Sequence, residues 1–191
     1  MFSKTKSKLE DTRNILDQLI RASDASSFRA LFNSFLNSAR AITYALQKEG
    51  KNISGFNDWY LLKQEEMIND ELLRFIQLAR KQDFHEGEHR LDFSTAITEF
   101  STNQAGSPPS TNAAIVIGAD GPFWLVDEGT PRERRIPIKQ GGTWATRVGI
   151  KNAPTKHRGK TLERNDPITI CHVVLVYFSE LVYEAMQSFS S

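Results

Sequence analysis

The sequence has little cysteine, no long apolar run and almost no net charge, and the first two of these absences exclude whole classes of protein. Its 191 residues include one cysteine, Cys171, which can form neither an internal disulfide nor a thiolate metal cluster. The longest apolar stretch, residues 168–178, is about half of the ~20 residues that span a bilayer. The N-terminus lacks the apolar run of a signal peptide. We therefore expect a cytoplasmic protein without a membrane partner.

The common motifs of enzyme sites are also missing. The chain has no glycine-rich loop that would cradle a phosphate, no His-Glu-x-x-His pair and no nucleophilic serine flanked by glycines. We accordingly expect no cofactor and no metal site. The content of 39% hydrophobic and 25% charged residues is typical of an ordinary globular domain with a sizeable core.

The net charge of +1 conceals an uneven distribution. Residues 132–164 contain ten Lys or Arg and two acidic residues, so an acidic remainder carries one basic segment. Such a segment could contact phosphates or the acidic surface of a neighbouring subunit, or could be a solvated loop. The candidate nucleic-acid contacts in it are Arg132, Arg134, Arg135, Lys156, Arg158 and Lys160.

Apolar residues recur at intervals of three and four over most of the first 87 residues, which predicts four helices. The clearest stripe begins at Phe28 and continues to the stop signal Gly50. Asn69 and Asp70 can cap the fourth helix, and Gly87 is placed to end it. A fifth helix is predicted near the C-terminus, because Asp166 and Pro167 fit the cap and first position of a helix.

Between the fourth and fifth helices the pattern changes to the alternation typical of strands. A turn at residues 119–122 predicts a hairpin, and Pro137 predicts an edge strand. The order of helices, strands and helix predicts an α+β fold, a mainly α-helical bundle with an inserted antiparallel β-meander and a C-terminal core helix. We predict a single domain over residues 1–191, with residues 1–89 and 165–191 as the bundle and 90–164 as the basic insertion.

The end of the fourth predicted helix carries an arginine and a histidine, Arg80 and His85, separated by four residues. In this respect the chain resembles the HEPN superfamily, helical bundles whose active members carry an arginine followed by a histidine at such a spacing. The resemblance implies a metal-independent endoribonuclease, a homodimer, and a role in a toxin–antitoxin or phage-defence system with an antitoxin as protein partner. It makes Arg80 and His85 the candidate catalytic residues, with Lys81, Glu86 and His89 in support.

The chemistry that the resemblance implies is reasonable for these side chains. His85 could act as acid or base on RNA, and Arg80 could balance the charge that develops on phosphorus. Five positions place the two side chains about 140° apart around a regular helix, so an unwound helix end or a second subunit would have to bring them together.

Two other functions fit the same sequence. The bundle could be a non-catalytic module that binds a nucleotide or a partner protein, with structural roles for Arg80 and His85. Alternatively, the chain could be an interaction protein whose basic segment docks on an acidic partner.

Overall fold

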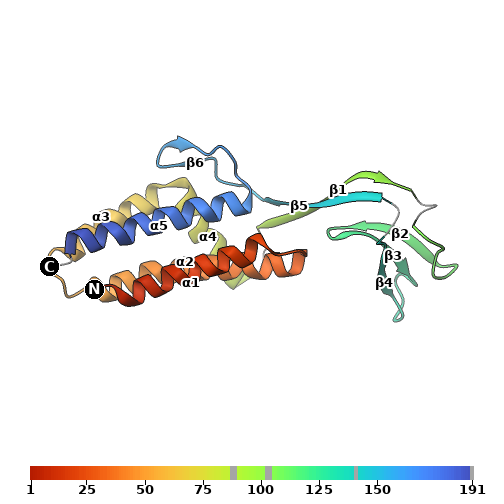
Figure 1. Cartoon of the computed structure of the whole chain (residues 1–191), viewed down its shortest axis with the longest axis horizontal. Coiled ribbons are helices and arrows are strands. Elements are labelled where there is room, and N and C mark those ends of the chain that lie inside the picture. Colours follow the sequence, from red (N-terminus) through yellow and green to blue (C-terminus); the bar gives the residue numbers. More distant parts are fainter. Residues whose placement is uncertain (87–89, 102–104, 140–141, 190–191) are drawn as a thin grey trace. The chain divides into compact units, whose positions relative to one another are not determined.

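The structure, a computed structural model, describes residues 1–86, 90–101, 105–139 and 142–189, without the side chains of 81–86, 95–100 and 142–146. It confirms the predicted α+β fold, with five helices and several small sheets. Figure 1 shows the helices and labels β1 to β6, which lie between α4 and α5 in the chain. The helices are α1 (Ser3–Ile20), α2 (Ala25–Gly50), α3 (Phe56–Asn69), α4 (Glu71–Glu86) and α5 (Pro167–Phe189).

Aspartate side chains begin three of these helices by accepting backbone N–H groups that have no partner within the helix. Asp24 accepts from the N–H of Ser27 at 2.8 Å, and Asp166 accepts from the N–H of Thr169 at 3.1 Å. Asp70 does the same for α4. The predicted caps at Asp70 and Asp166 are thus confirmed.

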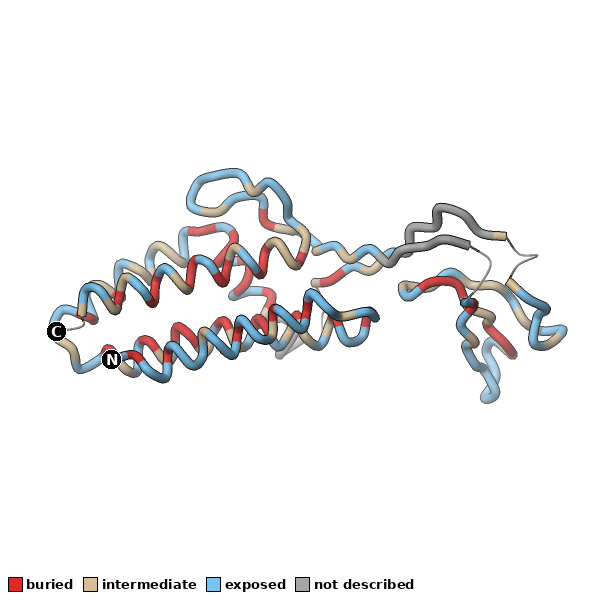
Figure 2. Tube along the Cα trace, in the orientation of Figure 1, coloured by how far each residue is buried: buried red, intermediate tan, exposed pale blue. Residues whose placement is uncertain are grey.

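The core of the bundle lies between α1, α2 and α5, as the inward-facing buried positions in Figure 2 show. The predicted stripe of α2 supplies fully buried residues such as Phe32, Phe35 and Ile42. Among the helices that are described, α5 is long and apolar enough to cross a membrane by length and composition alone, but half of its most apolar window is buried. Since α5 packs against α1 and α2, it is the predicted core helix.

An aromatic cluster closes the end of the bundle where α2 meets α3. Phe56 is fully buried and stacks on Tyr60, with ring centroids 5.6 Å apart. Phe2 and Phe189 bring the two ends of the chain to the same ring. A side chain at Gly50 would collide with the ring of Phe56, so this glycine provides space as well as the predicted end of α2.

The chain divides into two compact units. One unit is the bundle, Met1–Leu91 with Gly149–Ser191, and the other is Asp92–Val148. The predicted partition at residues 89 and 165 stays a prediction. In the structure the short hairpin of β6 (Lys156–His157) and β7 (Lys160–Thr161), which the alternation pattern did not reveal, belongs to the bundle unit.

The second unit contains the predicted hairpin and its continuation. The strands β2 (Ala113–Gly118), β3 (Gly121–Val126) and β4 (Arg134–Pro137) form an antiparallel meander. Gly118 pairs with Gly121 across the two-residue turn that the sequence predicts. The longer strands β1 (Leu91–Phe100) and β5 (Gly142–Ile150) pair with each other in a separate sheet.

One carboxylate holds the α3–α4 corner and the β6–β7 hairpin together. Asp70 is 7% exposed, and its backbone N–H ends α3 by donating to the carbonyl of Glu66. Its Oδ1 accepts the N–H of Leu73 at 2.9 Å, and its Oδ2 accepts the N–H of Arg158 at 2.6 Å. The Nδ1–H of His157 donates to Oδ1 at 3.1 Å, because an ionised carboxylate can only accept.

Burial by itself raises the pKa of Asp70, but the N–H groups of Arg158 and Leu73 and the hydrogen bond from His157 outweigh it. The pKa of Asp70 is therefore lower than that of an ordinary aspartate. The ionised form is the one that the fold stabilises.

Replacement of Asp70 by alanine should lower the free energy of unfolding by roughly 2–3 kcal/mol, because a helix cap and a buried backbone N–H both lose their acceptor. Denaturant titration followed by far-ultraviolet circular dichroism measures this change. Asp24→Ala is the matched control, since it removes a cap and no link between elements, and it should cost less. An equal loss in the two variants would show that Asp70 is only a cap.

The stabilisation by Asp70 should depend on pH in one direction. Because the folded state lowers the pKa of Asp70, this stabilisation is complete above the ordinary aspartate pKa of about 3.9 and is lost as the pH falls below it. The difference in unfolding free energy between the wild type and Asp70→Asn should therefore be constant near neutral pH and shrink in acid. Denaturant titrations of both proteins at a series of pH values test this. A difference that stays constant down to strong acid would contradict it.

Candidate functional site

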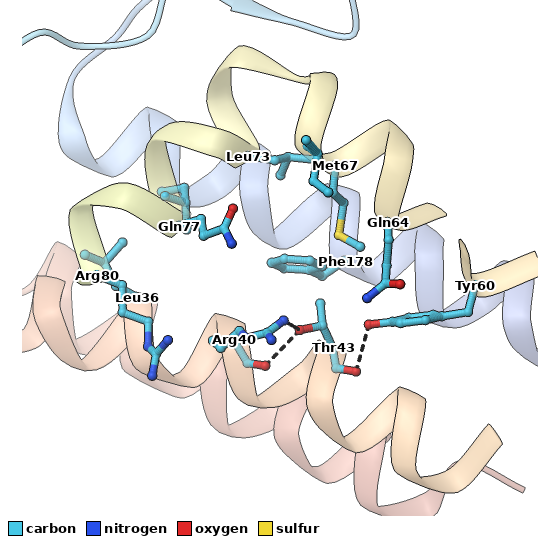
Figure 3. A pocket seen from close by; sticks show the side chains of 12 residues that line it. Leu36, Arg40, Thr43, Tyr60, Gln64, Met67, Leu73, Gln77, Arg80 and Phe178 are labelled. Atoms are coloured by element: carbon cyan, nitrogen blue, oxygen red, sulfur yellow. Dashed lines mark hydrogen bonds between the residues drawn. The ribbon is translucent and has the colours of Figure 1, made fainter. Parts of the chain in front are cut away.

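A pocket lies in the bundle unit between α2, α3 and α4, with Phe178 of α5 contributing to its lining (Figure 3). Its volume is about 160 Å³. Its apolar lining is Leu36, Met67, Ile68, Leu73, Ile76 and Phe178, and its polar lining is Arg40, Thr43, Tyr60, Gln64, Gln77 and Arg80. The pocket thus combines an apolar surface with a group of hydrogen-bond donors.

Two arginines from different helices line this pocket. Arg40, on α2, donates from one terminal nitrogen to the hydroxyl of Thr43 at 3.0 Å. Arg80, on α4, donates from Nε to the side-chain oxygen of Asn37 at 3.1 Å. Neither guanidinium forms an ion pair with any carboxylate whose position the structure describes. Both contacts are to neutral groups, and within the described part of the chain each uses one of the five N–H donors of its guanidinium.

The remaining polar groups of the pocket are neutral. Burial raises the pKa of Tyr60 and the charge of Arg40 offsets part of that rise, so the hydroxyl remains protonated near neutral pH and donates to the carbonyl of Thr43 at 3.2 Å. The side chains of Gln64 and Gln77 enter from α3 and α4 (Figure 3). The pocket is therefore a cationic site, and none of the described residues that line it is acidic.

Two other cations of the bundle unit, Arg158 and Lys63, are paired with carboxylates. Arg158 forms ion pairs with Glu180 at 2.6 Å and with Glu66 at 3.3 Å, and its guanidinium lies over the ring of Tyr177. Lys63 forms an ion pair with Glu184 at 2.8 Å. Arg40 and Arg80 differ from these two cations because none of the carboxylates that the structure describes neutralises them.

The candidate catalytic residues of the sequence fall at the end of α4. Arg80 lines the pocket. Lys81, His85 and Glu86 lie on the last turns of α4, with side chains outside those described, and His89 lies outside the described residues. The pairing of Arg80 with His85 in one site thus stays a prediction.

The candidate nucleic-acid residues belong to both units. Arg132, Arg134 and Arg135 are exposed on or beside β4, and the guanidinium of Arg135 lies 5.3 Å from the ring centre of Phe123. Lys156, Arg158 and Lys160 are on the hairpin of the bundle unit, where Arg158 is paired as described. A common nucleic-acid surface for these six residues stays a prediction.

Sequence reasoning missed Arg40, Tyr60, Gln64 and Gln77. A signal exists for Arg40, which lies one turn after the pocket residue Leu36 and so borders the stripe of α2. No comparable signal marks the two glutamines, because a glutamine on an amphipathic helix is ordinarily solvated. Among the described residues, no group of three or more His, Cys, Asp or Glu could hold a metal ion.

The fold and the pocket define a small α+β protein with a cationic site in its helical unit. Residues 3–127 match the family model of bacteriophage lambda protein ea47, and the chain belongs to that family. No curated protein and no solved structure matches the chain significantly.

This family assignment corrects the resemblance drawn from the sequence. The chain belongs to the ea47 family, and nothing connects it with the HEPN superfamily. The physical reason for the error is that an arginine and a histidine five positions apart are too short a pattern to identify a helical family. The endoribonuclease and toxin roles depended on that resemblance and have no support without it.

Proposed function

We propose that this member of the ea47 family is a non-catalytic binding module whose pocket takes a carboxylate group of a protein partner. The observation that carries the proposal is that Arg40 and Arg80 line one pocket and neither is paired with a described carboxylate. Two cations lining one pocket repel each other, and an anion between them would remove that repulsion. A guanidinium also matches the two oxygens of a carboxylate with two parallel hydrogen bonds.

The size of the pocket favours a side chain over a whole nucleotide. Pockets for small molecules usually measure roughly 300–1,000 Å³, whereas this one measures about 160 Å³. That volume suits the end of one acidic side chain. The two glutamine side chains add neutral donors that suit carboxylate oxygens.

The surroundings of the pocket favour a protein as the source of that side chain. Ile68 lines the pocket and is nevertheless 62% exposed, and Tyr44, one turn beyond Arg40, is also 62% exposed. Exposed apolar groups beside a small polar pocket are typical of surfaces that bind proteins.

Arginine side-chain NMR tests the proposal directly. The probe is N-acetyl-glutamate α-amide, which carries one side-chain carboxylate, and the control ligand is the neutral N-acetyl-glutamine α-amide. The Nε–Hε signals of Arg40 and Arg80, assigned by substitution to lysine, should shift with the first compound only. Arg40→Gln and Arg80→Gln should each weaken binding about tenfold or more, because each loses a charge-assisted hydrogen bond.

Arg13→Gln serves as the matched control, since Arg13 lies on α1 and is paired with Glu10. It should leave the affinity unchanged. Equal shifts with the two compounds, or an affinity that survives both pocket substitutions, would contradict the proposal. Stronger binding of inorganic phosphate than of the acetylated glutamate would also contradict it, since the pocket would then favour a different anion.

A further inference from the structure

The outer face of α3 carries a stripe of large apolar side chains around one carboxylate. Leu61, Glu65 and Ile68 are spaced by four and three positions, so they share one face of the helix. Leu61 and Ile68 are each 62% exposed, and Glu65 is exposed between them. We call these three residues the α3 stripe. An aliphatic pair this exposed on a helix of a folded unit costs hydrophobic free energy unless something covers it.

The stripe lies at the edge of the cationic pocket. Ile68 belongs both to the stripe and to the pocket lining, and Gln64 points into the pocket from the same helix (Figure 3). Tyr44 provides an exposed aromatic group on α2, one turn beyond Arg40. Through Ile68, the α3 stripe therefore borders the pocket that Arg40 and Arg80 line.

The charges on this surface are complementary but do not meet within one chain. Glu65 has no ion pair with any cation that the structure describes. Arg40 and Arg80 have none with any described carboxylate. A two-fold contact between two copies would pair these charges. The glutamate of each copy would then face the two arginines of the other.

We propose that the protein partner is a second copy of this chain. In the resulting two-fold dimer, the α3 stripes cover each other and Glu65 of each subunit enters the pocket of its neighbour, between Arg40 and Arg80. This inference rests on the proposed function, since it names the carboxylate that the pocket takes. Each pocket is complete only when the partner subunit supplies its glutamate.

The surface favours a second copy over an unrelated partner. A two-fold contact uses one patch twice, and the patch must hold both members of every charge pair. This patch does hold them, as Glu65 and the two arginines. A partner that supplies only acidic groups would satisfy the arginines but would leave Glu65 without a cation.

Sedimentation velocity of the full chain over a wide range of concentration tests the dimer. The wild type should be a dimer, and Glu65→Arg should raise its dissociation constant about tenfold or more by placing like charges together. The double variant Arg40→Glu with Arg80→Glu should have the same effect.

An equimolar mixture of the Glu65→Arg variant and the pocket double variant should restore the dimer. The arginine introduced on the stripe of one variant would then face the two glutamates introduced in the pocket of the other. The double variant's own Glu65 would face the unchanged Arg40 and Arg80 of the first. A mixture that stays monomeric, with both variants folded, would contradict the proposed pairing of charges.

Control substitutions test whether the dimer depends on the α3 stripe or on any exposed residue. Asp17→Arg reverses an exposed charge on α1 and should leave the dimer intact. Leu61→Gln with Ile68→Gln should weaken the dimer, whereas Val176→Gln, at an α5 position 55% exposed, should not. Circular dichroism verifies that each variant is folded. If the pocket double variant does not fold, the surface variants Glu65→Arg and Leu61→Gln with Ile68→Gln still decide the question.

The failures of the two proposals can be told apart. A wild type that stays monomeric at all concentrations, or a dimer that tolerates Glu65→Arg and the stripe substitutions, overturns the second-copy inference. In either case N-acetyl-glutamate α-amide would still shift the signals of Arg40 and Arg80 if the pocket binds carboxylates. In a wild-type dimer the probe would bind only in competition with Glu65 of the partner subunit, so the Glu65→Arg monomer is the decisive sample for the proposed function. If this monomer does not bind the probe, the proposed function is overturned, and with it the inference that depends on it.

Discussion

The bundle unit depends on a single buried carboxylate at the corner between two helices. Asp70 receives hydrogen bonds from the first turn of α4 and from Arg158 and His157 of the β6–β7 hairpin. A buried acid is costly unless several donors satisfy it, and here the donors come from elements far apart in sequence. The hydrogen bonds that offset the cost of burying this carboxylate therefore also fix the corner between α3 and α4 and attach the β6–β7 hairpin to it.

The position of the pocket depends on the corner that Asp70 forms between α3 and α4. Its lining comes from α3 and α4 on either side of Asp70 and from the facing side of α2. Glutamates neutralise Arg158 of the hairpin and Lys63 of α3. The two arginines of the pocket instead donate to neutral groups, Thr43 and Asn37, and neither forms an ion pair with a carboxylate that the structure describes.

The helices were predictable because apolar residues at intervals of three and four, bounded by Asp70, Asp166 and Gly50, are local signals. The hairpin at residues 119–122 was predictable for the same reason. The pairing of β1 with β5 and the docking of β6–β7 depend on contacts between distant segments, which no local pattern records. The site was only partly predictable. Arg80 was selected for a resemblance that is wrong, and Arg40 borders the predicted stripe of α2 but was not selected. That Arg40, Tyr60 and Arg80 line one pocket depends on the packing of α2, α3 and α4, which no local pattern records.

The chain leaves the bundle unit after Leu91 and returns to it at Gly149. The backbone N–H of Lys151 donates to the carbonyl of Arg90 at 2.8 Å, so the strand that leads out lies against the strand that leads back. A bundle that holds both ends of an insertion side by side does not depend on what the insertion contains. Residues 92–148 form such an insertion, so a change in the length or sequence of this unit need not alter the packing of the helices.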